Sequence, residues 1–150
     1  GIEVLERRTA NWSRAEALSL MENWLTSHQD EIDGVIAQND EMAIGAIQAI
    51  QASGRSLDDI AVAGVDGITD ALNAVQQGHM ATTLQDATAQ AQGALDVALT
   101  RIDKTDSLPL SATWTTYPEL DWADGGADTY NVPWTVVTSD NVDSLLNQRQ

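Results

Sequence analysis

The sequence predicts an α/β fold, with a doubly wound, mostly parallel sheet and helices on both faces. Short apolar runs at 34–37 and 60–65 are typical of strands buried in a parallel sheet. The segments around them carry apolar residues at three- and four-residue spacing, which indicates helices with one buried face. Strand and helix alternate strictly, so right-handed crossovers are expected to carry the helices across the sheet.

The N-terminal part is expected to begin with a strand and a capped helix. Residues 2–8 alternate apolar and polar side chains, as a strand at the margin of a sheet does. Ser13 and Glu16 form a capping box, in which the serine hydroxyl accepts from the third helical amide and the glutamate reaches back. After the next strand, Asp40 is expected to cap a helix that ends at Gly54.

The same alternation continues through the middle of the chain. The strand at 60–65 precedes a short helix that ends at Gly78, and another strand follows at 80–84. Residues 88–101 predict an alanine-rich helix. The apolar residues on one side of this helix are Ala91, Leu95, Ala98 and Ile102.

The last third of the chain has a different pattern. Residues 107–131 are rich in Thr, Asp, Gly, Pro and Trp without any period, which predicts a loop with short extended pieces. Residues 132–138 are β-branched and aromatic and predict a late strand. Residues 141–147 predict a closing helical turn.

Composition excludes several classes of function. The balance of 7 basic and 23 acidic residues gives a net charge of −16, which repels nucleic-acid backbones and anionic membrane surfaces. The chain has no cysteine, so disulfides, thiolate metal sites and cysteine nucleophiles are excluded. Its apolar runs are too short to span a bilayer. Neither the histidines nor the aspartates of 107–131 have metal-ligand spacing, and we predict no metal and no cofactor.

Four residues fall where the fold predicts a ligand. Ligands of open parallel sheets bind beyond the carboxyl ends of the strands. Asn39, Asp66 and Gln85 each follow or end a predicted strand, and Trp12 lies just past the first one. We therefore expect all four side chains to meet at one edge of the sheet.

The chemistry of these four side chains suits a sugar. The Asp66 carboxylate can accept two hydroxyl protons in charge-assisted hydrogen bonds. The amides of Asn39 and Gln85 can donate to a hydroxyl or accept from it. Trp12 offers a flat apolar surface for the C–H face of a sugar ring. No nucleophile, general base or metal is required, so we predict binding without catalysis.

Each of these residues also has a simpler interpretation. Trp12 can be a core tryptophan, and Asn39 and Asp66 can cap the helices that follow them. Gln85 can be a hinge residue that contacts only backbone. Arg14 is expected to pair with charges on the helix surface rather than to touch a ligand.

The chain resembles a known family along its first two-thirds. The matching segments, in order, are Ala10–Arg14, Ala37–Ala43, Gly64–Gly67 and Gly78–Gln85. They resemble the C-terminal half of periplasmic sugar-binding proteins of the ribose-binding type, which have the type I periplasmic binding fold. This resemblance implies a two-lobed receptor that closes on a monosaccharide (a pentose, a hexose or inositol) and delivers it to the membrane permease of an ABC transporter.

The resemblance also implies roles and boundaries. The family's stacking aromatic falls on Trp12, and its sugar-binding amide, carboxylate and hinge glutamine fall on Asn39, Asp66 and Gln85. The implied regions are a C-terminal sugar-binding lobe at 1–85, a crossing helix with an irregular acidic segment at 86–131, and a return strand with the C-terminal tail at 132–150. The implied location is the periplasm.

Two parts of the family's pattern are absent from this sequence. One is the N-terminal lobe, and the other is the first strand–helix unit of the lobe that is present. In the family, that strand lies centrally, between the strands expected at 2–8 and 34–37. We therefore expect the chain to need the missing N-terminal lobe, a second copy of itself or a re-paired sheet to cover exposed sheet edges.

Two other functions are weighed against transport. The effector domain of a LacI-type transcription repressor shares this fold, but it would have to work close to DNA, which the net charge of −16 disfavours. A doubly wound enzyme would need a glycine-rich phosphate loop or an acid–base pair at the strand ends, and the sequence has neither.

Overall fold

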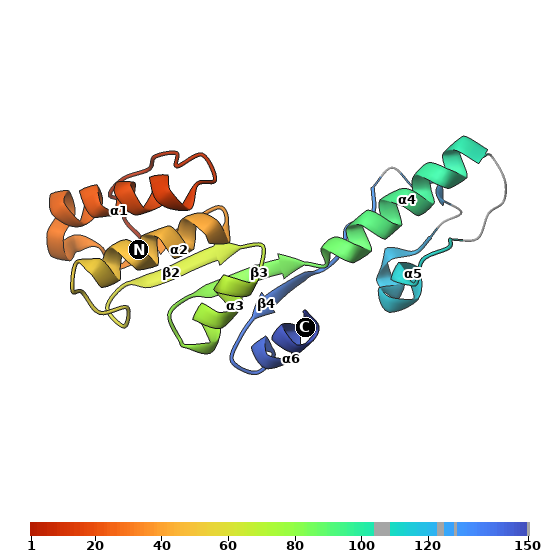
Figure 1. Cartoon of the computed structure of the whole chain (residues 1–150). Coiled ribbons are helices and arrows are strands. Elements are labelled where there is room, and N and C mark those ends of the chain that lie inside the picture. Colours follow the sequence, from red (N-terminus) through yellow and green to blue (C-terminus); the bar gives the residue numbers. More distant parts are fainter. Residues whose placement is uncertain (104–108, 123–124, 128, 150) are drawn as a thin grey trace. The chain divides into compact units, whose positions relative to one another are not determined.

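The computed structural model of the chain describes residues 1–103, 109–122, 125–127 and 129–149. These residues form two compact units, shown in Figure 1. The first unit combines residues 1–84 with 136–150, and the second consists of residues 85–135. Among the described residues, no helix is both long enough and apolar enough to cross a membrane.

A four-stranded sheet organises the fold. Its strands are β1 (Gly34–Ile36), β2 (Ala61–Val65), β3 (Ala81–Gln85) and β4 (Trp134–Val137), in the order β1-β2-β3-β4. β1 pairs with β2 and β2 pairs with β3, both in parallel, with Val35 opposite Val62 and Gly64 opposite Thr82. The parallel pairing and the helices between successive strands confirm the predicted α/β class.

The helices of the first unit supply its core. They are α1 (Arg14–His28), the 3-10 turn η1 (Gln29–Glu31), α2 (Asp40–Ala52), α3 (Thr69–Gln76) and α6 (Val142–Asn147). α1 packs beside α2, and α3 packs beside α6, as Figure 1 shows. One cluster of buried side chains joins these helices to the sheet, and Met21, Ile50 and Leu72 within it are almost completely enclosed.

The signals that the sequence places at the helix ends are confirmed in part. The Ser13 side chain accepts a hydrogen bond from the Glu16 amide at 3.3 Å, which confirms the N-cap of α1. The second half of the predicted capping box is wrong, because the Glu16 carboxylate accepts from the Asn11 side chain at 2.8 Å. Gly54 and Gly78, which follow α2 and α3, have φ angles of +80° and +79°, a conformation that favours glycine.

The strand predicted at residues 2–8 is wrong. This segment has no regular secondary structure, and its apolar residues Ile2 and Val4 are 94% and 64% exposed. Alternation produces a strand only where a neighbouring strand can exchange backbone hydrogen bonds with it. Within the described residues, the edge strand β1 pairs with β2.

The predicted strands are buried on one side only, so the expectation of full burial is wrong. Val62 and Gly64 of β2 are buried, whereas Ala61 is exposed and Ile36 of β1 is 78% exposed. α2 covers the buried side, because a Cβ atom added at Gly64 would lie 3.1 Å from the Ala43 side chain. The other side of these strands therefore presents apolar surface.

The second unit is built around α4 (Ala87–Asp103), with a short helix α5 (Thr113–Thr116) and a 3-10 turn η2 (Pro118–Leu120). The side of α4 on which the sequence places its apolar residues is exposed, with Leu95 at 59% and Ile102 at 79%. The buried side carries Ala89 and Asp96 instead. Periodicity identifies the residues that share a side, but it does not tell which side is covered.

The irregular stretch predicted at 107–131 contains more helix than expected. Both α5 and η2 lie in it, whereas residues 107, 108, 123, 124 and 128 fall outside the described part of the chain. The late strand and the closing helix are confirmed by β4 and α6.

Candidate functional site

Three of the four predicted site residues belong to the first unit, each at a junction between secondary-structure elements. Trp12 lies two residues before α1, Asn39 lies between β1 and α2, and Asp66 follows β2. Gln85 is the last residue of β3 and the first residue of the second unit. Trp12, Asn39 and Asp66 therefore share one unit, whereas Gln85 belongs to the other.

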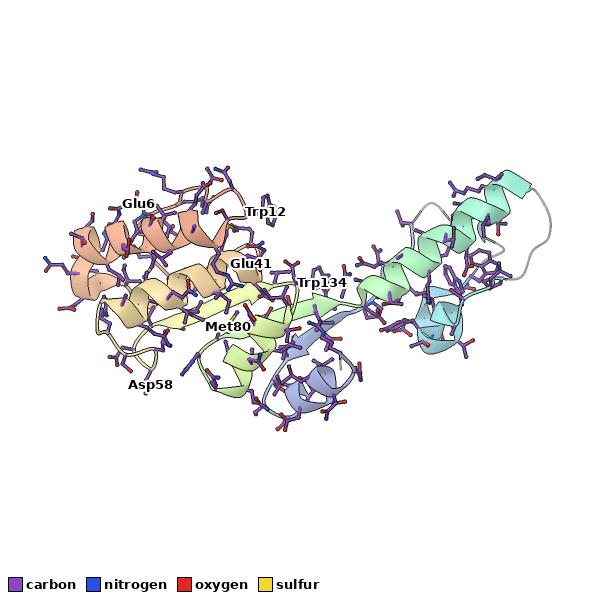
Figure 2. The ribbon with its side chains drawn as sticks, viewed as in Figure 1. Glu6, Trp12, Glu41, Asp58, Met80 and Trp134 are labelled. Carbon is purple, nitrogen blue, oxygen red and sulfur yellow. The ribbon has the colours of Figure 1, made fainter. Side chains whose placement is uncertain are left out.

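Arg14 joins the starts of three helices. Its Nε atom lies 2.7 Å from a carboxylate oxygen of Glu41 in α2, and its terminal nitrogen lies 2.7 Å from a carboxylate oxygen of Asp70 in α3. Arg14 is two residues from Trp12 and Glu41 is two residues from Asn39, so these pairs bring the segments of the predicted site together. Figure 2 shows Trp12 and Glu41 at the same end of α1 and α2. The prediction that Arg14 pairs with surface charges is confirmed.

Trp12 is not a core residue. Its side chain is 66% exposed. Its backbone has a φ angle of +61°, a left-handed conformation that is uncommon for a bulky residue. Such strained conformations cluster at binding sites, where the surrounding structure holds them in place. The indole is thus held at the start of α1 with a large face open to contact.

Asn39 is the cap of α2, and the prediction that Asp40 has this role is wrong. The Asn39 Oδ1 atom accepts a hydrogen bond from the Met42 amide at 3.0 Å. Asp40 is the first residue of the helix, and its side chain is fully buried. The cap uses only the oxygen of the Asn39 side chain, so its Nδ2 group is not used in the cap.

Asp66 does not cap the helix that follows it. The N-cap position of α3 is Ile68, and no side chain completes that cap. Asp66 is exposed, with a φ angle of +111°, and its amide donates to the Thr83 carbonyl at 2.8 Å. Although the residue is exposed overall, neighbouring protein atoms partly desolvate its carboxyl group and raise the pKa of Asp66 above its usual value. Its side chain is therefore presented on a strained turn rather than used in local structure.

Gln85 is engaged within the second unit. Its Nε2 atom donates to the Val132 carbonyl, and its Oε1 atom accepts from the Gln90 side chain at 2.7 Å. The first contact agrees with the simpler interpretation of Gln85 as a residue that binds backbone. A ligand would have to share or replace these hydrogen bonds.

Asp40 is a further residue at this site, and the sequence predicted it only as a helix cap. Its Oδ1 atom accepts from the Thr82 hydroxyl at 2.7 Å, and its Oδ2 atom accepts from the Ile68 amide at 3.0 Å. Asn39 and Asp40 are adjacent and both are common N-cap residues, but only one of them can cap α2. The sequence therefore already indicated that the other residue has a different role.

The second unit contains a cavity of about 460 Å³ on one side of α4. Its lining is largely apolar and includes Gly93, Trp114 and Tyr130, but none of the four predicted site residues. The rings of Trp114, Trp122 and Tyr130 pack against one another with centroids 4.5–6.3 Å apart. Its polar lining residues Gln90, Arg101 and Thr113 are each hydrogen-bonded to another group of the second unit. Within the described residues, no group of three or more metal-ligating side chains is present.

Comparison with known proteins gives concordant matches. A xylitol-binding protein of Mycolicibacterium smegmatis is 47% identical over 98 residues, which are 65% of this chain and 28% of that protein. Two solved structures each cover 97% of this chain, and this chain covers 44% of each of them. One is an ABC transporter solute binding protein from Bacillus halodurans with bound myo-inositol, with 37% identity and a TM-score of 0.71. The other is the Caulobacter myo-inositol binding protein bound to myo-inositol, with 28% identity and a TM-score of 0.76.

The chain thus spans less than half the length of these relatives. Residues 1–106 match the family described as the periplasmic binding protein domain. This range includes the sheet strands β1 to β3 and all four predicted site residues. The chain therefore belongs to the periplasmic binding protein family.

Proposed function

We propose that this chain is roughly the C-terminal half of a two-lobed receptor that binds a monosaccharide or a cyclitol and delivers it to an ABC transporter, without catalysing a reaction. The observation that carries the proposal is the meeting of the α1, α2 and α3 starts through Arg14, which brings the segments of Trp12, Asn39 and Asp66 together. Relatives named for xylitol and myo-inositol binding support a polyol as the ligand.

In this proposal each side chain has a distinct task. The exposed indole of Trp12 stacks on the C–H face of the ring. The Asp66 carboxylate accepts hydroxyl protons, and the Nδ2 group of Asn39, which the helix cap does not use, donates to a hydroxyl oxygen. Gln85 adds a contact when its hydrogen bonds in the second unit rearrange.

The proposed division of the chain assigns residues 1–85 to the sugar-binding lobe, 86–131 to the crossing helix and acidic segment, and 132–150 to the return strand and tail. The missing N-terminal lobe is the proposed cover for the exposed side of α4. The missing first strand–helix unit, or a second copy of the chain, is the proposed cover for β1 and its exposed Ile36. Membership of the periplasmic binding protein family supports a periplasmic location and a membrane permease as partner.

The alternative, a LacI-type repressor domain, has weaker support. The three relatives are all named as binding proteins, one for xylitol, one for myo-inositol and one as a solute binding protein with bound myo-inositol. A net charge of −16 also disfavours a domain that functions next to DNA, because the phosphate backbone repels it.

The test uses the complete two-lobed protein and calorimetric titration with ribose, xylitol and myo-inositol. Asn39→Asp keeps the oxygen that caps α2 but removes the Nδ2 donor, so stability should stay within about 0.5 kcal/mol while affinity falls at least about tenfold. Asn39→Ala removes both the capping oxygen and the Nδ2 donor, so affinity should fall and stability should decrease by about 1 kcal/mol.

Asp66→Ala should abolish measurable binding. Its matched control is Asp58→Ala, which removes the same charge from an exposed residue at the far end of the sheet in Figure 2. Asp58→Ala should bind as the unmodified protein does. Equal affinity of the Asp66→Ala protein and the unmodified protein would contradict the assignment of this site.

A further inference from the structure

Asp40 is a buried carboxylate that the proposed sugar contacts do not use. Its side chain has 0% exposure, yet it carries no ion pair with a Lys, Arg or His among the described residues. Burial raises the pKa of the Asp40 carboxyl, and hydrogen bonds from Thr82 and Ile68 act in the opposite direction. A buried carboxyl group without an ionic partner is costly to keep in a folded protein, so its retention calls for a reason.

The contacts of Asp40 point to the turn that carries Asp66. Asp40 Oδ2 accepts from the Ile68 amide, two residues after Asp66. Asp66 and Gly67 have successive positive φ angles of +111° and +63°, so this turn needs an external restraint. On the other side, the Asp66 amide is fixed by the Thr83 carbonyl of β3 at 2.8 Å.

The second oxygen of Asp40 connects the turn to the sheet. Asp40 Oδ1 accepts from the hydroxyl of Thr82, which is itself 2% exposed and lies on β3. Gly64 of β2 leaves the space for this carboxylate, because a Cβ atom added there would lie only 2.3 Å from Asp40 Oδ1. Asp40 is thereby packed between β2, β3 and the turn after β2.

We infer that Asp40 is a positioning residue that holds the turn of Asp66 in the conformation that receives the sugar. The inference rests on the proposed function. Asp40 follows Asn39 directly, so one buried carboxylate fixes both the start of α2, where Asn39 lies, and the turn where Asp66 lies. A site held in its bound conformation before the ligand arrives loses less entropy on binding.

The experiment compares three variants of the complete two-lobed protein. Asp40→Asn removes the charge with little change of shape. Thr82→Val removes the hydroxyl donor but leaves the Ile68 hydrogen bond in place. Ile50→Val is the matched stability control, because Ile50 has 0% exposure in the core and takes no part in the site.

Affinity for ribose, xylitol and myo-inositol is measured by calorimetry well below the Tm of each variant. Amide hydrogen exchange of Gly67 and Ile68 is measured without ligand. Asp40→Asn should lower the affinity at least about tenfold, as expected for the loss of a hydrogen bond to a charged group. It should also accelerate exchange at Ile68. Thr82→Val should show a smaller loss of affinity, and Ile50→Val should bind as the unmodified protein does despite a lower Tm.

The outcomes separate the two claims. If the unmodified protein binds a sugar and Asp40→Asn binds it equally well, the positioning role is overturned while the proposed function stands. If the unmodified protein binds none of the three sugars, the proposed function fails, and the role of Asp40 in it fails too. Should Asp40→Asn not fold, Thr82→Val decides the question, since it must weaken binding more than Ile50→Val at a comparable loss of Tm.

Discussion

The two units of the chain are stabilised in different ways. In the first unit, four helices and the sheet share one apolar core, and side chains such as Leu72 are completely enclosed. In the second unit, α4 exposes Leu95 and Ile102, and its buried side centres on a carboxylate, Asp96. The first unit thus has a core of its own, whereas the apolar side of α4 has the character of a surface that another segment covers.

The buried carboxylates of the two units show the same difference. Asp96 accepts from the backbone of Leu110, from the backbone and hydroxyl of Ser111, and from the indole of Trp114, at 2.6–3.1 Å. Burial opposes ionisation of Asp96, but these hydrogen bonds outweigh it and lower its pKa. For Asp40, burial is the stronger influence and the pKa is raised. Hydrogen bonds favour the ionised form of Asp96, whereas burial disfavours the ionised form of Asp40.

The largest expected effect tests the core of the first unit. Leu72→Ala removes a side chain with 0% exposure and should reduce the free energy of unfolding by about 2–5 kcal/mol, since it leaves a cavity. The matched control is Leu95→Ala, the same change at a residue 59% exposed, which should cost much less in the 150-residue chain. Urea denaturation followed by circular dichroism measures both. Similar losses for the two variants would remove the distinction between the units.

The next effect is a pair of opposite pH dependences. Because the pKa of Asp96 is lowered on folding, its contribution to stability is present above the unfolded value of about 3.9 and is lost as pH falls through the folded value. Asp96→Asn should therefore cost about 1.5–3 kcal/mol at neutral pH, and this cost should shrink below about pH 4.

The stability contribution of Asp40 should have the opposite pH dependence. Its raised pKa means that protonation favours the folded state, a contribution present below about pH 3.9 and lost as pH rises through the folded value. The cost of Asp40→Asn should therefore decrease as pH rises. Chemical denaturation of both variants and the unmodified protein between pH 3 and pH 7 measures the two trends. Parallel trends would contradict the contrast drawn between these carboxylates.

Local signals in the sequence predicted most of the fold. Ser13 as an N-cap and Gly54 and Gly78 as helix ends depend on backbone chemistry within a few residues, and all three are confirmed. The strand expected at 2–8 depended on a neighbouring strand, which alternation within the segment cannot supply. The choice between Asn39 and Asp40 as the cap depended on Thr82 and Ile68, more than 25 residues away in the chain.

The candidate site was predictable in position more than in detail. The rule that ligands bind beyond the carboxyl ends of parallel strands located Asn39 and Asp66 at strand ends. It could not indicate that Asp66 and Trp12 have positive φ angles, because tertiary contacts impose these conformations. Nor could it indicate that both polar groups of Gln85 are already hydrogen-bonded within the second unit.

The smallest expected effect in the 150-residue chain concerns the exposed side of α4. Ile102→Ala removes a side chain that is 79% exposed, so the free energy of unfolding should change by no more than about 0.5 kcal/mol. We propose that an N-terminal lobe covers this side in the complete protein, where the same substitution should then cost about 2–5 kcal/mol, as for a buried isoleucine. Denaturation of both forms measures the difference. Only burial of Ile102 by the other lobe should make this substitution destabilising. A cost that stays small in the complete protein would therefore mean that the other lobe does not cover the exposed side of α4.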